Sequence, residues 1–220
     1  MPDVNMGGRI KDRVREFFQK GYKSSNKLYA IATDGSVDLA LWNTIQLKAA
    51  TRWNDALASR ALRLGYAASY YDLAQALVRV PMEDRAGNCG EQAALAAWFL
   101  LKSEFLRRNR IYTVEITHPG DHALCLVSQA PIPEAGRTFA SVGQFVRSSV
   151  ARSYLVIDPW LNTCCSADQY LLMGGQKLDK WQADGKRVSW HAGSQGPGWY
   201  PPGGEYKNAF ALAPLEIHPF

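Results

Sequence analysis

The chain has 220 residues, of which 47% are hydrophobic and 11% aromatic, and its formal net charge is +5. This is enough apolar material for a sizeable core, which excludes a disordered or fibrous protein. No stretch reaches the roughly 18 apolar residues that a membrane span needs, and residues 1–30 lack the apolar segment of a secretory signal. We therefore expect a soluble chain with a cytoplasmic fold.

Positive charge gathers at the beginning of the chain, where residues 1–30 hold seven basic and three acidic side chains. Such a basic arm suits contact with an acidic partner or a membrane surface. Because no nucleic-acid motif or aromatic-interleaved basic stripe accompanies it, we expect no nucleic-acid partner. The pattern leaves the oligomeric state open.

The first 80 residues are predicted to be mainly helical. Ile10, Val14 and Phe17 share one helix face, which predicts an amphipathic helix over 9–20 that docks on the body of the protein. Helix-forming residues predict further helices over 37–63 and 67–79. We take 1–80 as a helical N-terminal region with the basic arm and 81–220 as a second domain, with one single domain as the alternative.

The remaining chain predicts an α+β architecture. Nearly every residue from Ala93 to Leu106 is apolar or small, which is typical of a helix buried on almost all sides. Short β-type runs follow at 111–117, 123–128 and 154–157. This order predicts a buried helix packed on a small antiparallel sheet. The tail after Gly174 is rich in Gly, Pro and Trp and predicts a long loop.

The segment Gly87-Asn88-Cys89-Gly90-Glu91 places a cysteine at the start of the buried helix. Asn88 has the position of an N-cap, and Glu91 that of the residue that reaches back in a capping box. The helix dipole and the unpaired amides there favour a thiolate, so we expect a depressed pKa for the Cys89 thiol. Gly90 leaves room for a carbonyl group, with the Cys89 amide as donor to an oxyanion. The alternative is a structural cysteine in the core.

A thiol nucleophile needs an imidazole as base and acid, and two histidines follow the helix. His122 opens an apolar strand and is favoured over His118, which lies in a Pro-Gly turn that holds a ring less rigidly. Asp158 ends a later apolar strand and can orient the imidazole. Trp160 could shield that pair from water. The alternatives to a catalytic role are that His122 only caps the edge of a strand and that Asp158-Pro159 only marks a turn.

These motifs resemble the papain-like and transglutaminase-like cysteine enzymes, above all bacterial effector and toxin domains that carry Gly-Asn-Cys-Gly-Glu, Asp-His and Asp-Pro-Trp. The three motifs stand at 87–91, 121–122 and 158–160, and the resemblance covers about residues 85–162. It implies a papain-like catalytic domain in which Cys89 is the nucleophile, His122 the general base and acid, and Asp158 the orienting residue. The papain-type glutamine before the cysteine is missing, so Asn88 and Gln92 are the candidate second oxyanion donors.

The resemblance implies a protein substrate, with a host-cell protein as one option. It also leaves open delivery outside the producing cell by a specialised secretion system. The leading hypothesis is a cysteine-dependent amidohydrolase that deamidates glutamine. The alternatives are a papain-like cysteine protease, an enzyme that cross-links glutamine to amines, and a non-catalytic protein-binding effector module.

No metal or organic cofactor is expected. The four cysteines, at 89, 125, 164 and 165, lack paired spacing and are predicted to be thiols in a reducing setting. Cys164 and Cys165 with His191 would make a poor metal site, because adjacent cysteines give poor two-point geometry. The tail aromatic residues are interpreted as packing rather than as a substrate-contacting wall. These residues are Trp181, Trp190, Trp199 and Tyr200.

Overall fold

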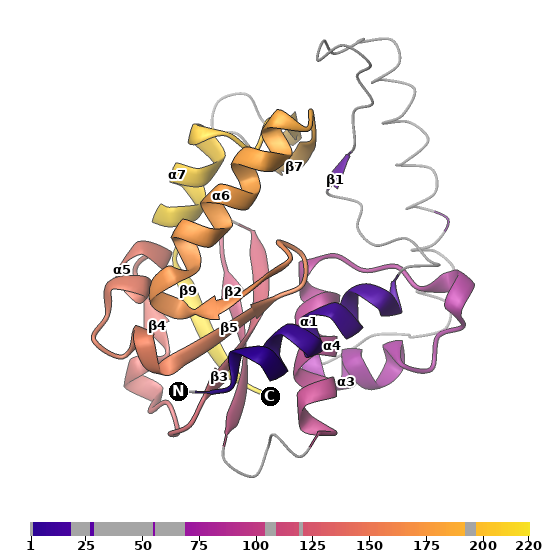
Figure 1. The fold of residues 1–220 in the computed structure, drawn as a ribbon, viewed down its shortest axis with the longest axis vertical. Coiled ribbons are helices and arrows are strands. Elements are labelled where there is room, and N and C mark those ends of the chain that lie inside the picture. The colour runs from indigo at the N-terminus through magenta and orange to yellow at the C-terminus, as the bar shows by residue number, and fades with distance from the viewer. Residues whose placement is uncertain are drawn as a thin grey trace.

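The computed structural model describes residues 2–18, 27–28, 55, 69–103, 109–118, 121–191 and 197–220, and within them it has an α+β fold (Figure 1). Its main sheet has six strands in the order β4-β9-β2-β3-β5-β6, and all neighbouring strands are antiparallel. These strands are β2 (Arg110–Ile116), β3 (His122–Ser128), β4 (Thr138–Phe139), β5 (Tyr154–Asp158), β6 (Thr163–Ser166) and β9 (Leu215–Pro219). A second sheet joins β1 (Lys27–Leu28), β7 (Arg187–His191) and β8 (Pro197–Tyr200).

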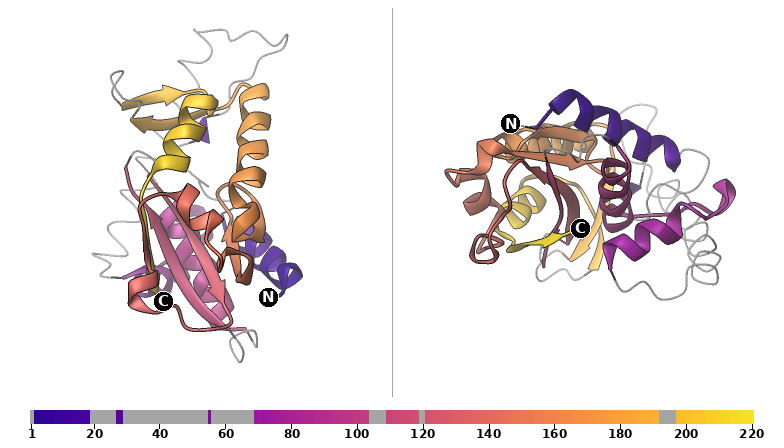
Figure 2. Two further views of the ribbon diagram at one scale, coloured as in Figure 1. Left: turned by 90° about the vertical axis from the view of Figure 1, so that its left-hand side faces the viewer. Right: turned by 90° about the horizontal axis from the view of Figure 1, so that it is seen from below.

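Helices cover both faces of the main sheet (Figures 1 and 2). One face packs against α1 (Val4–Phe17), α3 (Tyr70–Leu77) and α4 (Cys89–Leu101). The other packs against α5 (Val142–Arg147), α6 (Tyr170–Ala183) and α7 (Gly204–Leu212). Because side chains alternate along a strand, β3 and β5 contribute to both cores. Cys125 and Ile157 face α1 and α4, whereas Leu124 and Val156 face the helices of the opposite layer.

The predicted elements of the sheet and of the buried helix are confirmed. The three predicted strands correspond to β2, β3 and β5 within one residue at either end. Helix α4 begins at Cys89, and its residues from Gln92 to Ala97 are all buried. The last residues of the predicted 93–106 helix lie partly outside the described residues.

The N-terminal helix lies earlier than predicted. It begins at Val4 because the Asp3 carboxylate caps it, accepting hydrogen bonds from the amides of Asn5 and Met6. It contacts α4, β5 and β6, as its apolar stripe predicts. The predicted 67–79 helix is α3, which Ser69 caps. The predicted 37–63 helix lies, apart from residue 55, outside the described residues.

The prediction of a long loop after Gly174 is wrong. This segment contains most of α6, then β7, β8, α7 and β9. Its described glycines and prolines lie partly between these elements, as Pro201 and Pro202 do, and partly inside them, as Gly175 does in α6 and Gly198 in β8. The composition alone therefore resembled that of a loop. Strand β9 pairs with β2 and β4, which precede it by a large part of the chain. Trp181 and Trp190 are buried in the core, which agrees with their interpretation as packing residues.

None of the described helices has the length and apolar character needed to cross a membrane.

Candidate functional site

Cys89 stands at the first position of α4, at the end of a tightly built loop. Asn88 and Glu91 form a capping box, in which the Glu91 carboxylate accepts from the Asn88 amide at 2.9 Å. A Cβ atom at Gly87 would lie 2.8 Å from both Glu91 Cβ and Phe18 Cζ, so the loop needs glycine there. The Cys89 side chain is half-buried and packs against the core on the α5–α7 side of the sheet.

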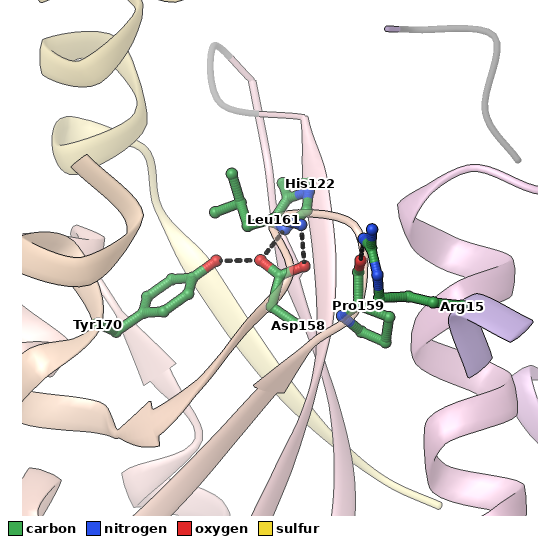
Figure 3. A network of polar contacts seen from close by, with 6 residues as sticks. All are labelled: Arg15, His122, Asp158, Pro159, Leu161 and Tyr170. Carbon is green, nitrogen blue, oxygen red and sulfur yellow. Dashed lines mark hydrogen bonds and ion pairs between the residues drawn. The ribbon is translucent and has the colours of Figure 1, made fainter. Parts of the chain in front are cut away.

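His122 and Asp158 meet at the same end of two neighbouring inner strands of the sheet (Figure 3). His122 opens β3 and Asp158 closes β5, its antiparallel neighbour, and alternation turns both side chains toward α5–α7. His122 Nε2 lies 2.7 Å from Asp158 Oδ2, and both side chains are almost completely shielded from solvent. Asp121, just before His122, has a φ of 34°, a left-handed conformation that aspartate tolerates better than most residues.

Two more donors hold the Asp158 carboxylate (Figure 3). The Tyr170 hydroxyl donates to Oδ2 at 2.7 Å, and the Leu161 amide donates to Oδ1 at 2.9 Å. Burial and the neighbouring carboxylate raise the pKa of Tyr170 well above its ordinary value, so the hydroxyl keeps its proton and acts as donor. The sequence analysis did not identify Tyr170 as a site residue, because the local pattern of α6 does not indicate which face of the helix contacts Asp158.

The histidine and the aspartate stabilise each other's charge. Burial alone would lower the pKa of His122, but the Asp158 carboxylate and a hydrogen bond with Cys89 raise it to about 10. Burial would likewise raise the pKa of Asp158, but His122, the Leu161 amide and the Tyr170 hydroxyl hold it below its ordinary value. The raised pKa of His122 and the lowered pKa of Asp158 both favour the imidazolium–carboxylate form of the pair.

Cys89 is a neighbour of the same ring. His122 Nε2 lies 2.7 Å from Asp158 Oδ2, and Cys89 is among the groups that raise the pKa of His122. Asp158 Oδ2 carries no proton, so Nε2 must be the donor in that contact. The Asp158 contact therefore leaves Nδ1 as the other ring nitrogen. The structure thus joins two of the predicted site residues, His122 and Asp158, in a contact of 2.7 Å, and Cys89 is a neighbour of the imidazole.

Aromatic rings enclose the imidazole. The ring centroids of Trp160 and Phe210 lie 5.0 and 5.6 Å from that of His122. Trp160 is only 1% exposed and packs edge-on against Trp181 at 5.2 Å. The predicted shielding role of Trp160 therefore agrees with its position.

The supporting residues surround the start of α4. Among the described residues, a Cβ atom at Gly90 would meet Tyr70 alone, at 4.0 Å, so these residues leave space beside Cys89 on that side. Asn88 is the half-buried N-cap. Gln92 is buried, and its Nε2 donates to the Gly87 carbonyl at 3.4 Å, so this amide braces the loop before the cysteine. His118, the alternative base, is exposed beyond the end of β2.

Helix α1 also reaches the site. Arg15 donates from its guanidinium to the Pro159 carbonyl at 3.0 Å, one residue after Asp158 (Figure 3). Arg13, from the same basic arm, lies over the ring of Phe99 at 4.2 Å. Part of the predicted basic arm is therefore used in packing α1 against the body of the protein.

All four cysteines are free thiols. Across the part of the chain that the structure describes, no group of three or more His, Cys, Asp or Glu side chains is arranged to hold a metal ion.

Comparison with known proteins adds no relative: no protein-family model, curated protein or solved structure matches the chain.

Proposed function

We propose that the protein is a cysteine-dependent amidohydrolase with a papain-like or transglutaminase-like core, which deamidates glutamine side chains of a target protein. The observation that carries the proposal is the buried His122–Asp158 contact of 2.7 Å, with Cys89, the first residue of a helix, as a neighbour of the same imidazole. A nucleophile beside a base that a third group orients is the arrangement used in covalent acyl transfer.

The charge state of His122 supports a reactive sulfur. An imidazolium and the N-terminal end of a helix both favour the thiolate form of a neighbouring cysteine. The first helical turn is open beside Gly90, which leaves space for a planar carboxamide next to the sulfur. Aromatic rings on the other side of His122 keep water from competing for its hydrogen bonds.

In the first half of the reaction, the Cys89 sulfur attacks the carboxamide carbon and forms a C–S bond. The carbonyl oxygen takes up negative charge, which the Cys89 amide can stabilise, with Asn88 and Gln92 as the candidate second donors. Nδ1 of His122 gives its proton to the departing nitrogen, the C–N bond breaks, and ammonia leaves a thioester on Cys89.

In the second half, His122 takes a proton from a water molecule that attacks the thioester carbon. The C–S bond breaks and the product is a glutamate side chain. The balance is one carboxamide and one water converted to one carboxylic acid and one ammonia. Asp158 holds the ring in the orientation that both halves require.

The resemblance to effector and toxin domains supports a host-cell protein as substrate and delivery outside the producing cell. The basic residues of α1 that remain exposed, such as Arg9, suit a first contact with an acidic partner or membrane surface.

The test is a comparison of wild type with Cys89→Ala in a cell lysate, followed by mass spectrometric mapping of glutamine-to-glutamate changes. We expect new glutamates with wild type and none with Cys89→Ala, while Cys165→Ala, at a buried cysteine in β6, keeps the activity. New peptide termini in place of glutamates would identify a protease. Retention of full activity in Cys89→Ala would refute the proposal.

A further inference from the structure

A groove of about 610 Å³ lies beside the start of α3, over strands β2 and β9. Tyr70, Tyr71 and Phe220 form aromatic walls, with 5.8 Å between the ring centroids of Tyr71 and Phe220. The polar lining comes from the two strands and includes Glu115 and Thr113 of β2. The groove therefore combines aromatic faces with a carboxylate.

Strand register places a second carboxylate next to the first. Glu115 stands directly opposite Glu216, and Thr113 directly opposite His218, so all four side chains share one face of the sheet. His218 Nε2 lies 3.7 Å from Glu115 Oε2 and 3.8 Å from Glu216 Oε2. Like charges directly opposite each other destabilise a strand pair, and a bound cation removes that repulsion.

Two polar atoms at the groove have no hydrogen-bond partner among the described residues. Thr113 is completely buried, and its Oγ1 is unpaired although it lines the groove. The Nε2 atom of His218 is likewise shielded from solvent and makes no hydrogen bond, although it lies at ion-pair distance from the Glu115 and Glu216 carboxylates. A buried polar group without a partner costs free energy, which a ligand with hydrogen-bond donors can recover at Thr113.

Tyr70 connects the groove to Cys89. Its pKa is raised by burial, by the nearby Glu115 carboxylate and by the neighbouring Cys89. Its ring also lies 4.0 Å from the position of a Cβ atom at Gly90. Tyr70 therefore borders both the groove and the first turn of α4.

We propose that this groove binds a cationic side chain, lysine or arginine, of the protein substrate and so places a neighbouring glutamine at Cys89. The proposal rests on the proposed function and adds the chemical class of sequence that the site selects. Aromatic faces with a carboxylate attract an organic cation through cation–π and charge-assisted hydrogen bonds.

The test measures binding without turnover, in the Cys89→Ala variant, by calorimetric titration. The probes are Nα-acetyl-lysine methylamide, its uncharged norleucine analogue, and n-butylamine, which carries the charge without a peptide backbone. We expect the lysine derivative to bind more tightly than the other two. Adding Glu115→Gln should weaken lysine binding about fivefold, the range for a partly exposed ion pair. Glu134→Gln removes the same charge at an exposed site outside the groove and should change nothing.

Equal binding of the lysine and norleucine derivatives, or no effect of Glu115→Gln, would overturn the proposal. Butylamine binding as tight as the lysine derivative would also overturn it, because the ligand would then be a free amine. Since no chemistry occurs in Cys89→Ala, these outcomes leave the amidohydrolase proposal standing. That proposal fails only in the lysate experiment.

Discussion

Replacement of Tyr170 by phenylalanine isolates one of the three donors that hold Asp158. The Tyr170→Phe change removes only the hydroxyl that donates to Oδ2 at 2.7 Å and keeps the ring, which is 1% exposed between α6 and the core. No cavity forms, so the whole effect comes from the hydrogen bond. His122 Nε2 still donates to the same oxygen.

A hydrogen bond to a charged group contributes about 1.5–3 kcal/mol to stability. Because a second donor remains on Oδ2, we expect the lower half of this range, about 1.5–2 kcal/mol less free energy of unfolding at pH 7. For a chain of this size that corresponds to a melting temperature lower by about 3–8 °C. Urea denaturation followed by tryptophan fluorescence measures the difference directly.

The pH dependence of this difference provides the decisive check. The pKa of Asp158 is lowered in the folded chain, so its interactions stabilise the fold above the unfolded value of 3.8 and are lost as the pH falls through the folded value. The cost of Tyr170→Phe should therefore shrink in acid. Tyr112→Phe is the matched control, because its hydroxyl accepts from the Ile132 amide and no titrating group is involved. An equal cost of Tyr170→Phe at every pH, or no cost at pH 7, would refute the reasoning.

Three further predictions concern the sulfur, the histidine and the first helix. Iodoacetamide should alkylate Cys89 more slowly in His122→Ala than in wild type, on the order of tenfold at pH 7. His118→Ala is the control and should leave the rate unchanged. Equal rates in wild type and both variants would contradict a Cys89–His122 pair. The free energy of unfolding of wild type relative to that of His122→Gln should fall as the pH rises from 6.5 to about 10, because the folded chain keeps a proton on His122 that the unfolded chain loses. Denaturation at a series of pH values measures this difference. A difference that rises with pH would contradict the prediction. Gly7→Ala should destabilise the protein by about 1–3 kcal/mol, since its Cβ would lie 2.7 Å from Cys164 Sγ and 2.8 Å from Leu155 Cδ2. Gly8→Ala, with nothing within 4 Å, should stabilise it by about 0.5–1 kcal/mol; thermal melts of both variants measure this contrast, and equal melting temperatures would show that α1 does not pack as described.

The location of the candidate site could be predicted because its residues sit at ends of elements with local signals. Asn88 and Glu91 mark a helix start by capping chemistry, which places Cys89 without any knowledge of the tertiary structure. His122 and Asp158 stand where apolar runs begin and end, so the strand boundaries position them. Their meeting on one face follows from the antiparallel pairing of β3 and β5.

The contacts that complete the site could not be predicted in this way. Tyr170 reaches Asp158 only because α6 packs across the sheet, a contact that depends on the whole layer of α5, α6 and α7. The groove beside Tyr70 likewise depends on β9 pairing with β2, so that Glu216 and His218 stand opposite Glu115 and Thr113. Pairing over such a distance in sequence leaves no local pattern, and the glycine- and proline-rich composition before β9 pointed to a loop.

The hydrogen bond from Arg15 to the Pro159 carbonyl spans 144 residues of sequence and ties the opening helix to the turn that follows Asp158. A tether, fusion partner or bound surface that pulls on α1 therefore applies its force within one residue of that carboxylate. The way in which the beginning of the chain is anchored therefore affects how rigidly Asp158 holds the His122 imidazole in place. The protein attached to a bead by its amino end and the protein attached by its other end are therefore under different mechanical load at this contact.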